Sequence, residues 1–277
     1  MIEFVKHSKI DKSKWDSLVD MNKGLGHWFS KSWFLEANYS KWDALIYGDY
    51  ECALPLPRSH FLKHHRVYQP FFTRAYQVLG NTDAAIEKQF YDFLTHSKIK
   101  GSFCLHSSVE LTEKRVFQVL NLEVDYKFSK NTIRNINKAK NANINITEMD
   151  VKSFVSGFEK YTGKLLTGYK SKHYAYLEKL LSSAEENNCL KLISAQKSSE
   201  TLAATAFLIS ENKALYLAAF VSDAGKKVGA SHFITNAFIE TNSQLKSLDF
   251  GGSNVESVAR FYKGFAADDS FYSLFEF

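Results

Sequence analysis

Residues 127–140 form a stretch without acidic residues whose positive charges could bind an anion. It holds Lys127, Lys130, Arg134, Lys138 and Lys140, and these five charges equal the formal net charge of the whole chain, +5. Lys130, Arg134 and Lys138 follow one another at intervals of four, so in a helix they project from one face. Their repulsion costs roughly a few tenths of a kcal/mol per pair, which a bound polyphosphate reverses. The spacing favours a phosphate-containing ligand such as a nucleotide, CoA or an RNA acceptor stem.

A second stretch without acidic residues, 52–82, carries Arg58, Arg66 and Arg74. Guanidinium groups match phosphate and carboxylate oxygens better than ammonium groups do. The charge pattern therefore predicts an anionic partner, and the alternative is a solvated face that balances acidic residues elsewhere. No motif for reading DNA bases is present, so DNA is not an expected partner.

Asp249 is the carboxylate whose surroundings suggest proton transfer. It ends an apolar strand pattern beside Gly251 and Gly252, where it could accept a proton from an attacking amine or cap the following turn, and the cap is the favoured interpretation. The sequence has no G-x-S-x-G elbow, no Walker or G-x-G-x-x-G phosphate loop, and no C-x-x-C or H-E-x-x-H metal pattern. The chemistry that fits is direct attack of an amine on an activated acyl carbon held beside it.

The composition predicts a compact globular protein of two domains in a reducing compartment. A length of 277 residues exceeds that of one common domain, and 45% hydrophobic residues exclude a disordered or collagen-like chain. Cys52, Cys104 and Cys189 are odd in number and widely spaced, which argues against a disulfide framework. The charged start of the sequence and the lack of an apolar run of about 18 residues predict neither a secretory signal nor a membrane span, and hence a cytoplasmic location.

Apolar periodicity and chain breakers predict alternating strands and helices in the first half. The expected strands are 2–6, 42–48, 51–57, 102–106 and 115–121, and the expected helices are 11–20, 30–39 and 83–98. Thr82 or Asp83 is the expected cap of the last of these helices. All three prolines, Pro55, Pro57 and Pro70, lie in this half, so the strands around them should be edge-like or bulged.

The second half repeats this order of elements. The expected helices are 130–141, 151–164, 172–187, 231–243 and 255–263, and the expected strands are 143–150, 189–196, 201–210, 213–221, 248–252 and 270–277. Ser129 is the expected N-cap of the first helix, and a loop with Gly225 and Gly229 is expected before the helix at 231. The shared order predicts a structural duplication. The fold class is α/β with two tandem domains, 1–125 and 126–277, each a mixed and mostly antiparallel sheet flanked by helices.

Two segments carry a resemblance to a known family. The first is SKNTIRNINKAK at 129–140, and the second is LDFGGSNVESVARFYKGFAA at 248–267. The second segment follows the pattern N-x4-A-x-x-aromatic-Tyr-x-x-Gly-Phe through Asn254, Ala259, Phe261, Tyr262, Gly264 and Phe265, with one residue fewer before the aromatic residue and one fewer after the tyrosine. Together with the order of elements, these segments resemble the GNAT fold of acyl-CoA N-acyltransferases. The duplication resembles its FemABX branch, the aminoacyl-tRNA-dependent peptidyltransferases of peptidoglycan cross-bridges and their bacterial relatives.

The resemblance implies a donor site in the second half. In GNAT enzymes a loop that reads Arg or Gln, two residues, Gly, one residue, then Gly or Ala holds the CoA pyrophosphate on backbone N–H groups. This chain reads KKVGAS at 226–231, with lysine at the first of these places and serine at the last. The residues assigned to donor or phosphate binding are Lys130, Arg134, Lys138, Lys226, Lys227, Gly229, Ala230, Ser231 and Asn254. The departures favour a donor other than CoA, because the FemABX branch does not use CoA.

The resemblance also implies two candidate catalytic residues, Tyr262 and Lys263. In acetyltransferases of this fold the tyrosine protonates the leaving thiolate. In FemABX-like proteins the lysine would be the charge that meets a phosphate or carbonyl oxygen. The sequence leaves open which of the two points inward, and an aromatic side chain that only packs the helix against the sheet is the alternative role for Tyr262.

The sequence thus predicts an N-acyltransferase or aminoacyltransferase of the GNAT/FemABX type. Its donor is acyl-CoA or aminoacyl-tRNA, with no tightly bound cofactor and no metal, and its acceptor is an amine such as that of a cell-wall precursor. We expect the donor to lie in an open cleft of the second domain, and Tyr169, Lys170, Lys172 and His173 could close over a ligand from the connection between two helices. The first domain lacks these signals and is expected to be non-catalytic. The alternative function is that of a non-catalytic binding protein that keeps a degenerate tandem fold.

Overall fold

The computed structural model describes residues 1–277 except residues 23, 25, 26, 39, 40, 60–65, 112, 167, 253 and 254. The chain divides into two compact units. The first comprises Met1–Arg115 together with Phe271–Phe277, and the second comprises Val116–Ser270. The expected boundary lay after residue 125. The observed division instead falls inside a strand, between Arg115 and Val116, and assigns the C-terminal residues to the first unit.

The first unit is built on a mostly antiparallel sheet. Its strands are β1 (Ile2–Val5), β2 (Trp42–Tyr47), β3 (Cys52–Ser59), β4 (Arg66–Val67), β5 (Leu79–Gly80) and β6 (Lys100–Leu105). They follow the order β1-β2-β3-β4-β6, with β5 beside β3 and the C-terminal part of β13 (Asp268–Glu276) beside β6. β4 and β6 run parallel, and the other strand pairs described in this unit run antiparallel.

Aspartate side chains cap the two longest helices of the first unit, and aromatic side chains of its helices are buried. The helices are η1 (His7–Lys9), α1 (Lys12–Met21), α2 (His27–Ser30), α3 (Ser32–Asn38) and α4 (Ala84–His96). The Asp83 carboxylate accepts a hydrogen bond from the Ile86 N–H at 2.8 Å, which confirms one of the two predicted caps. Trp15, Phe34 and Phe90 have no exposed surface and form part of the core of this unit.

The second unit has a sheet of six strands in the order β7-β12-β11-β10-β9-β8. The strands are β7 (Glu113–Asn121), which begins in the first unit, β8 (Asn145–Glu148), β9 (Leu190–Lys197), β10 (Glu200–Ser210), β11 (Lys213–Val221) and β12 (Ser247–Asp249). β11 and β12 run parallel, whereas the other neighbouring strands run antiparallel.

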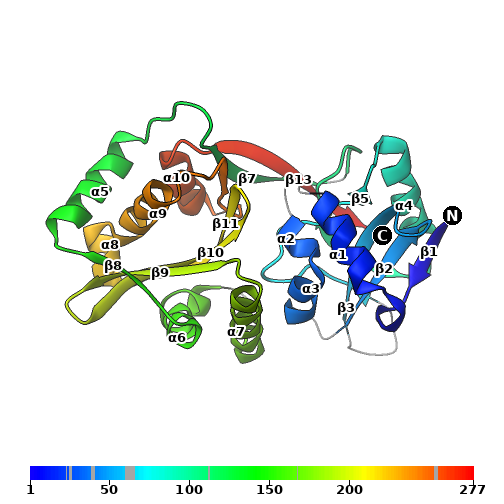
Figure 1. Cartoon of the computed structure of the whole chain (residues 1–277), viewed down its shortest axis with the longest axis horizontal. Coiled ribbons are helices and arrows are strands. Elements are labelled where there is room, and N and C mark those ends of the chain that lie inside the picture. The colour runs from blue at the N-terminus through cyan, green and yellow to red at the C-terminus, as the bar shows by residue number, and fades with distance from the viewer. Residues whose placement is uncertain are drawn as a thin grey trace. The chain divides into compact units, whose positions relative to one another are not determined.

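Helices cover both faces of this second sheet. They are α5 (Lys130–Asn141), α6 (Val151–Tyr161), η2 (Gly163–Leu165), α7 (Ser171–Glu186), α8 (Asp223–Val228), α9 (Ala230–Thr241) and α10 (Glu256–Gly264). In Figure 1, α6 and α7 lie on one face, and α5, α8, α9 and α10 lie on the other. Ser129 caps α5 by accepting a hydrogen bond from the Thr132 N–H, as predicted. The expected fold class, mixed and mostly antiparallel sheets flanked by helices, is confirmed.

Candidate functional site

β11 and β12 part near the middle of the second sheet. They pair over three positions only, from Lys213↔Ser247 to Leu215↔Asp249. β12 then ends, and the next residue, Phe250, donates its N–H to the Gln118 carbonyl oxygen of β7 at 2.9 Å. β11 continues to Val221 beside β10. The two parallel strands therefore separate beyond Asp249, and the space between them is where the sequence predicts an open cleft.

Three aromatic rings occupy the point of separation. Tyr216, Phe250 and Tyr262 expose 8%, 1% and 8% of their surface. The rings of Phe250 and Tyr262 stack with centroids 4.7 Å apart, and the Tyr216 ring meets that of Tyr262 edge-on at 5.8 Å. The three residues come from β11, from the position that follows β12 and from α10, and their rings meet at one place. The expectation of an open cleft at this point is wrong for this structure, because side chains fill it.

Asp249 lies at the edge of this aromatic cluster and is 3% exposed. Its Oδ1 accepts a hydrogen bond from the Gly251 N–H at 2.8 Å. The predicted turn cap is therefore present. Such a bond satisfies a backbone donor at the strand end and fixes the orientation of the carboxylate.

Tyr262 points into the protein and Lys263 points to solvent, which answers the question that the sequence left open. Burial raises the pKa of the Tyr262 phenol above its usual value of 10, and the neighbouring Tyr216 and Asp249 add to the effect. Burial likewise raises the pKa of Tyr216 to about 12. Both phenols are protonated at neutral pH and can donate a hydrogen bond. Lys263 pairs instead with Asp269 at 2.6 Å on the surface.

The predicted phosphate loop, 226–231, spans the end of α8 and the start of α9. Lys226 and Lys227 lie in α8, which Ser222 caps and Gly229 ends. The Lys226 N–H bonds to the Ser222 carbonyl oxygen and is not free for an anion. Gly229 adopts φ +79°, and a Cβ on it would lie 2.5 Å from the Asn135 carbonyl oxygen of α5, so only glycine fits there.

The remaining residues assigned to the donor differ in accessibility. Ala230 is fully buried at the start of α9, and Ser231 is partly exposed. Asn254 lies outside the described residues. The role of this group of residues in donor binding remains a prediction.

The row of basic residues on α5 faces solvent, as its spacing predicts. Lys130, Arg134 and Lys138 are exposed, while Thr132, Ile136 and Ala139 on the opposite side are buried. The exposed side forms a shallow groove of about 610 Å³ lined by Lys130, Ile133, Arg134, Asn137, Lys138 and Asn141. This is a surface of positive charge and amide groups on which an extended polyanion can lie.

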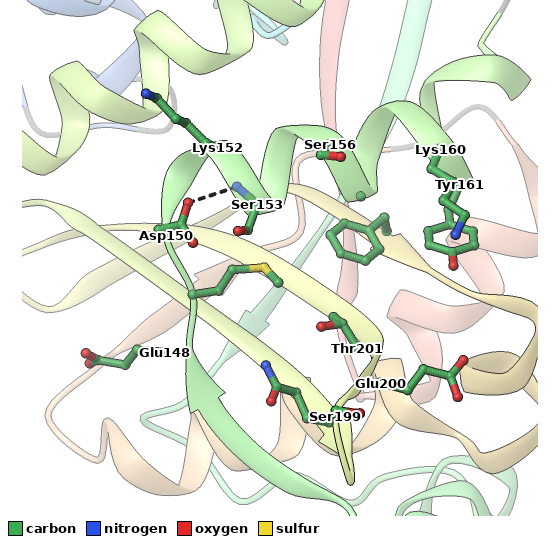
Figure 2. A pocket seen from close by; sticks show the side chains of 14 residues that line it. Glu148, Asp150, Lys152, Ser153, Ser156, Lys160, Tyr161, Ser199, Glu200 and Thr201 are labelled. Carbon is green, nitrogen blue, oxygen red and sulfur yellow. Dashed lines mark hydrogen bonds between the residues drawn. The ribbon is translucent and has the colours of Figure 1, made fainter.

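A larger groove, of about 800 Å³, lies on the other face of the second sheet. Figure 2 shows α6 along one wall and the end of the β9–β10 hairpin along the other. Phe220 and Gly157 form part of its lining, and a Cβ on Gly157 would collide with the Phe220 ring. The Asp150 carboxylate at the groove accepts a hydrogen bond from the Ser153 N–H, drawn as a dashed line in Figure 2.

This larger groove could not be found in the sequence. Its lining comes from the ends of α6, β8, β9, β10 and β11, and therefore from segments distant in the sequence. Three acidic residues, Glu148, Asp150 and Glu200, and the hydroxyls of Ser153, Ser156, Ser199 and Thr201 contribute to it. The polar run at 197–200 is a weak signal, because by itself it indicates only a turn. Carboxylates and hydroxyls beside an aromatic ring suit an amine-bearing ligand.

Comparisons with known proteins support the fold and leave the specific function open. No protein-family model matches the sequence, and a sequence comparison with curated proteins finds no match. The solved structure of FemX is similar, with 12% identity, a TM-score of 0.67, and coverage of 98% of this chain and 96% of FemX. The C-terminal domain of a putative lysylphosphatidylglycerol synthetase from Agrobacterium fabrum is similar at 9% identity and a TM-score of 0.56, covering 95% of this chain and 90% of that one.

A tandem GNAT protein from the clavulanic acid biosynthesis pathway is also similar over its whole length. The identity is 9%, the TM-score is 0.54, and the coverage is 100% of this chain and 98% of that one. The chain therefore has a tandem GNAT-like fold with FemABX-like relatives in structure, which confirms the resemblance identified from the sequence. This fold is one on which acyltransferases and aminoacyltransferases are built, and a fold alone does not fix a substrate.

Two further features concern membranes and metals. Among the described helices, none has the length and apolar character that a bilayer span requires. In the part of the chain that the structure describes, no three His, Cys, Asp or Glu side chains gather as a metal site would need.

Proposed function

We propose that the chain transfers an aminoacyl or acyl group from an RNA-linked donor to an amine. The observation that carries the proposal is the α5 groove, in which Lys130, Arg134 and Lys138 face solvent on one side of a helix. A row of cations at intervals of four matches a flexible chain of phosphates better than a single pyrophosphate. The fold of the neighbours, which include FemX and a putative lysylphosphatidylglycerol synthetase, is compatible with this chemistry.

Two local features favour RNA over CoA as the carrier of the donor group. The first half of the predicted phosphate loop, 226–228, lies in α8, so its N–H groups are in a helix and do not face a pyrophosphate. The rings of Tyr216, Phe250 and Tyr262 fill the space between β11 and β12, where the long arm of a thioester would need room. A ribose ester delivers its acyl carbon on a compact nucleoside end and does not need that channel.

Tyr262 is the residue that we assign to proton transfer. The amine nitrogen attacks the acyl carbon, the ester oxygen leaves, and the phenol donates its proton to that oxygen. The proton lost by the nitrogen then restores the phenol, so the net change is one proton moved from the amine to the leaving alcohol. The raised pKa of Tyr262 keeps the phenol protonated before the attack. Asp249 holds the adjacent turn.

The acceptor amine is assigned to the groove along α6. Its lining holds the carboxylates of Glu148, Asp150 and Glu200 together with the ammonium groups of Lys152 and Lys160, so carboxylates exceed ammonium groups by one and attract an ammonium group before it loses a proton. α5 and α6 lie on opposite faces of the second sheet (Figure 1). Donor and acceptor then approach the parted strands from opposite sides, and the proposed transfer requires the packed rings of Tyr216 and Phe250 to shift so that the ester oxygen reaches the Tyr262 phenol.

The test compares binding and transfer with a matched pair of variants. Arg134→Ala with Lys138→Ala should weaken binding of aminoacyl-tRNA about tenfold or more at low salt and reduce the slope of log K against log salt by about 1.4 to 1.8, because each phosphate contact contributes roughly 0.7 to 0.9. Lys6→Ala with Lys9→Ala removes the same charge from exposed positions of the first unit and should change neither quantity. Equal losses in both pairs, or a thermal shift with acetyl-CoA and none with the RNA, would contradict the proposal.

A non-catalytic binding protein is the second candidate, favoured by the packed aromatic cluster at the parted strands. Single-turnover assays with radiolabelled aminoacyl-tRNA and small amines distinguish the two candidates. Binding without transfer to any amine, together with unchanged affinity in Tyr262→Phe, supports the binding protein. Transfer that depends on Tyr262 supports the enzyme.

A further inference from the structure

The connection between α6 and α7 presents two leucines to solvent. Leu165 is 76% exposed and Leu166 is 42% exposed. Among the large hydrophobic side chains that the structure describes, only Met1 is more exposed than Leu165. Two exposed leucines that are adjacent in sequence place apolar surface in contact with water, where it is available to an apolar partner.

Hydrogen bonds hold these leucines outward. The Leu165 N–H bonds to the Thr162 carbonyl oxygen at 2.9 Å, and the Leu166 N–H bonds to the Gly163 carbonyl oxygen at 3.1 Å. The Thr162 hydroxyl donates to the Ala219 carbonyl oxygen of β11 at 3.0 Å. The backbone that leads to the leucines is therefore tied to itself and to the sheet, so their exposure is a feature of the fold.

Aromatic packing fixes the other end of the connection. The Tyr169 ring lies 4.9 Å from that of Tyr174 and 5.9 Å from that of Phe158, measured between centroids. Gly163 permits the approach of Tyr174, because a Cβ on it would lie 2.5 Å from the phenol oxygen. The Lys170 N–H bonds to Nδ1 of His173 at 2.8 Å. These residues form a rigid base for the segment that carries Leu165 and Leu166.

The charges that flank the two leucines along the chain are all positive. From residue 160 to residue 177 the chain has no aspartate or glutamate and four lysines. Lys164, Lys170 and Lys172 are exposed. Burial lowers the pKa of the nearby His173, and Lys172 and Lys170 lower it further.

We propose that the exposed side chains of Leu165 and Leu166, flanked by Lys164, Lys170 and Lys172, dock on the surface of an anionic lipid bilayer, with the two leucines inserted among the acyl chains. Lysines with long apolar stems keep their ammonium groups at the headgroups while neighbouring leucines enter the apolar layer. Anionic headgroups attract the flanking lysines over about a Debye length. An acidic protein partner would satisfy the lysines, but it would not require the exposed leucines between them. The proposal does not depend on the function proposed above.

The experiment is sedimentation of the full chain with sucrose-loaded vesicles of phosphatidylcholine alone or with phosphatidylglycerol at about one third, a range in which surface charge is strong. Wild-type protein should bind the anionic vesicles and release them on addition of salt. Leu165→Ser with Leu166→Ser should weaken binding about tenfold or more, since the loss of two inserted side chains removes most of the apolar contribution. Val124→Ser, at another exposed apolar position, is the matched control and should bind as wild type does.

Charge reversal tests whether the lysines beside the two leucines contribute to binding of the anionic lipid. Lys164→Glu with Lys170→Glu and Lys172→Glu should abolish binding, whereas the same change at the exposed residues Lys6, Lys9 and Lys98 should weaken it far less. Circular dichroism and thermal melting confirm that each variant is folded. As an independent measurement, brominated lipid in anionic vesicles should quench the added fluorescence of the Leu165→Trp variant relative to wild type. The proposal is overturned if wild type ignores anionic vesicles, if the leucine and control variants bind equally, or if that added fluorescence is not quenched.

Discussion

The two units of the protein use charged residues differently. In the first unit, charged groups are built into the interior: Asp43 is fully buried against Arg58 at 2.9 Å, and the buried Glu87 accepts hydrogen bonds from the Ser107 hydroxyl and the Ser108 N–H, both at 2.9 Å. In the second unit, the rows of lysine and arginine on α5 and on the 164–172 connection lie on the surface. The difference shows that a cluster of charges in a sequence identifies a ligand site only when packing leaves the charges accessible.

The largest effect should come from removing residues 271–277, which tests whether the first unit depends on them. Ser273–Glu276 pair with β6, and the Phe275 ring lies 5.1 Å from that of Tyr91. Losing a strand and a buried aromatic should cost more than about 5 kcal/mol in the free energy of unfolding, because a buried phenylalanine alone contributes about 3 to 5. Urea denaturation measures it, with Phe275→Leu as the mild control. Near-wild-type stability of the truncated chain would show that the first unit is complete without these residues.

Arg58→Met should have the next largest effect, since it leaves the Asp43 carboxylate buried without its cation. The expected loss in the free energy of unfolding is about 3 to 5 kcal/mol. Arg134→Met in the second unit removes an exposed charge and should change stability little. Adding Asp43→Asn to Arg58→Met should recover part of the loss. If both arginine variants lose equal stability, the contrast between the two units does not hold.

Tyr262→Phe tests the role proposed for the second unit. Removing the phenol hydroxyl should lower the single-turnover transfer rate by about 100-fold, within the usual range for loss of one acid or base. Melting temperature should change little, because the ring contacts with Phe250 and Tyr216 remain. Lys263→Ala, which breaks only the surface pair with Asp269, should leave the rate unchanged. A larger effect of Lys263→Ala than of Tyr262→Phe would reverse the assignment.

The smallest predicted effect is a dependence of stability on pH that originates in the first unit. Burial, with a further contribution from Arg74, lowers the pKa of His106 to about 3. Because the unfolded pKa is higher, about 6.5, unfolding takes up a proton, and the contribution of His106 is complete above pH 6.5 and declines as the pH falls towards 3. The slope is at most about 1.4 kcal/mol per pH unit. Denaturation at pH 4.5, 5.5 and 6.5 should show a weaker slope in His106→Gln, and an identical slope would contradict the assignment.

Features set by local chemistry could be predicted from the sequence. Spacing predicts the row of basic residues on α5. Residue type predicts the helix caps at Ser129 and Asp83 and the turn at Asp249, and the structure contains each of these features. Most strands and long helices also follow from periodicity. The helix α8 could not be predicted in this way, because a helix of six residues that contains Gly225 has too few periodic positions to distinguish it from a loop.

Features set by tertiary contacts could not be predicted. The strand at 270–277 was expected, but its pairing with β6 depends on chain segments far apart, and periodicity does not identify partners. The closure of the parted strands by Tyr216, Phe250 and Tyr262 also depends on which aromatic side chains meet. The groove along α6 combines the ends of five elements, none of which has a distinctive pattern by itself.

The membership of Phe271–Phe277 in the first unit affects how the protein is made. During synthesis β6 leaves the ribosome long before its partner strand exists, so a nascent chain carries an unsatisfied sheet edge while the whole second unit is translated. The first unit therefore completes its sheet only after the second unit has been translated. A chaperone that shields this edge should therefore matter more to the yield of protein than to its final stability.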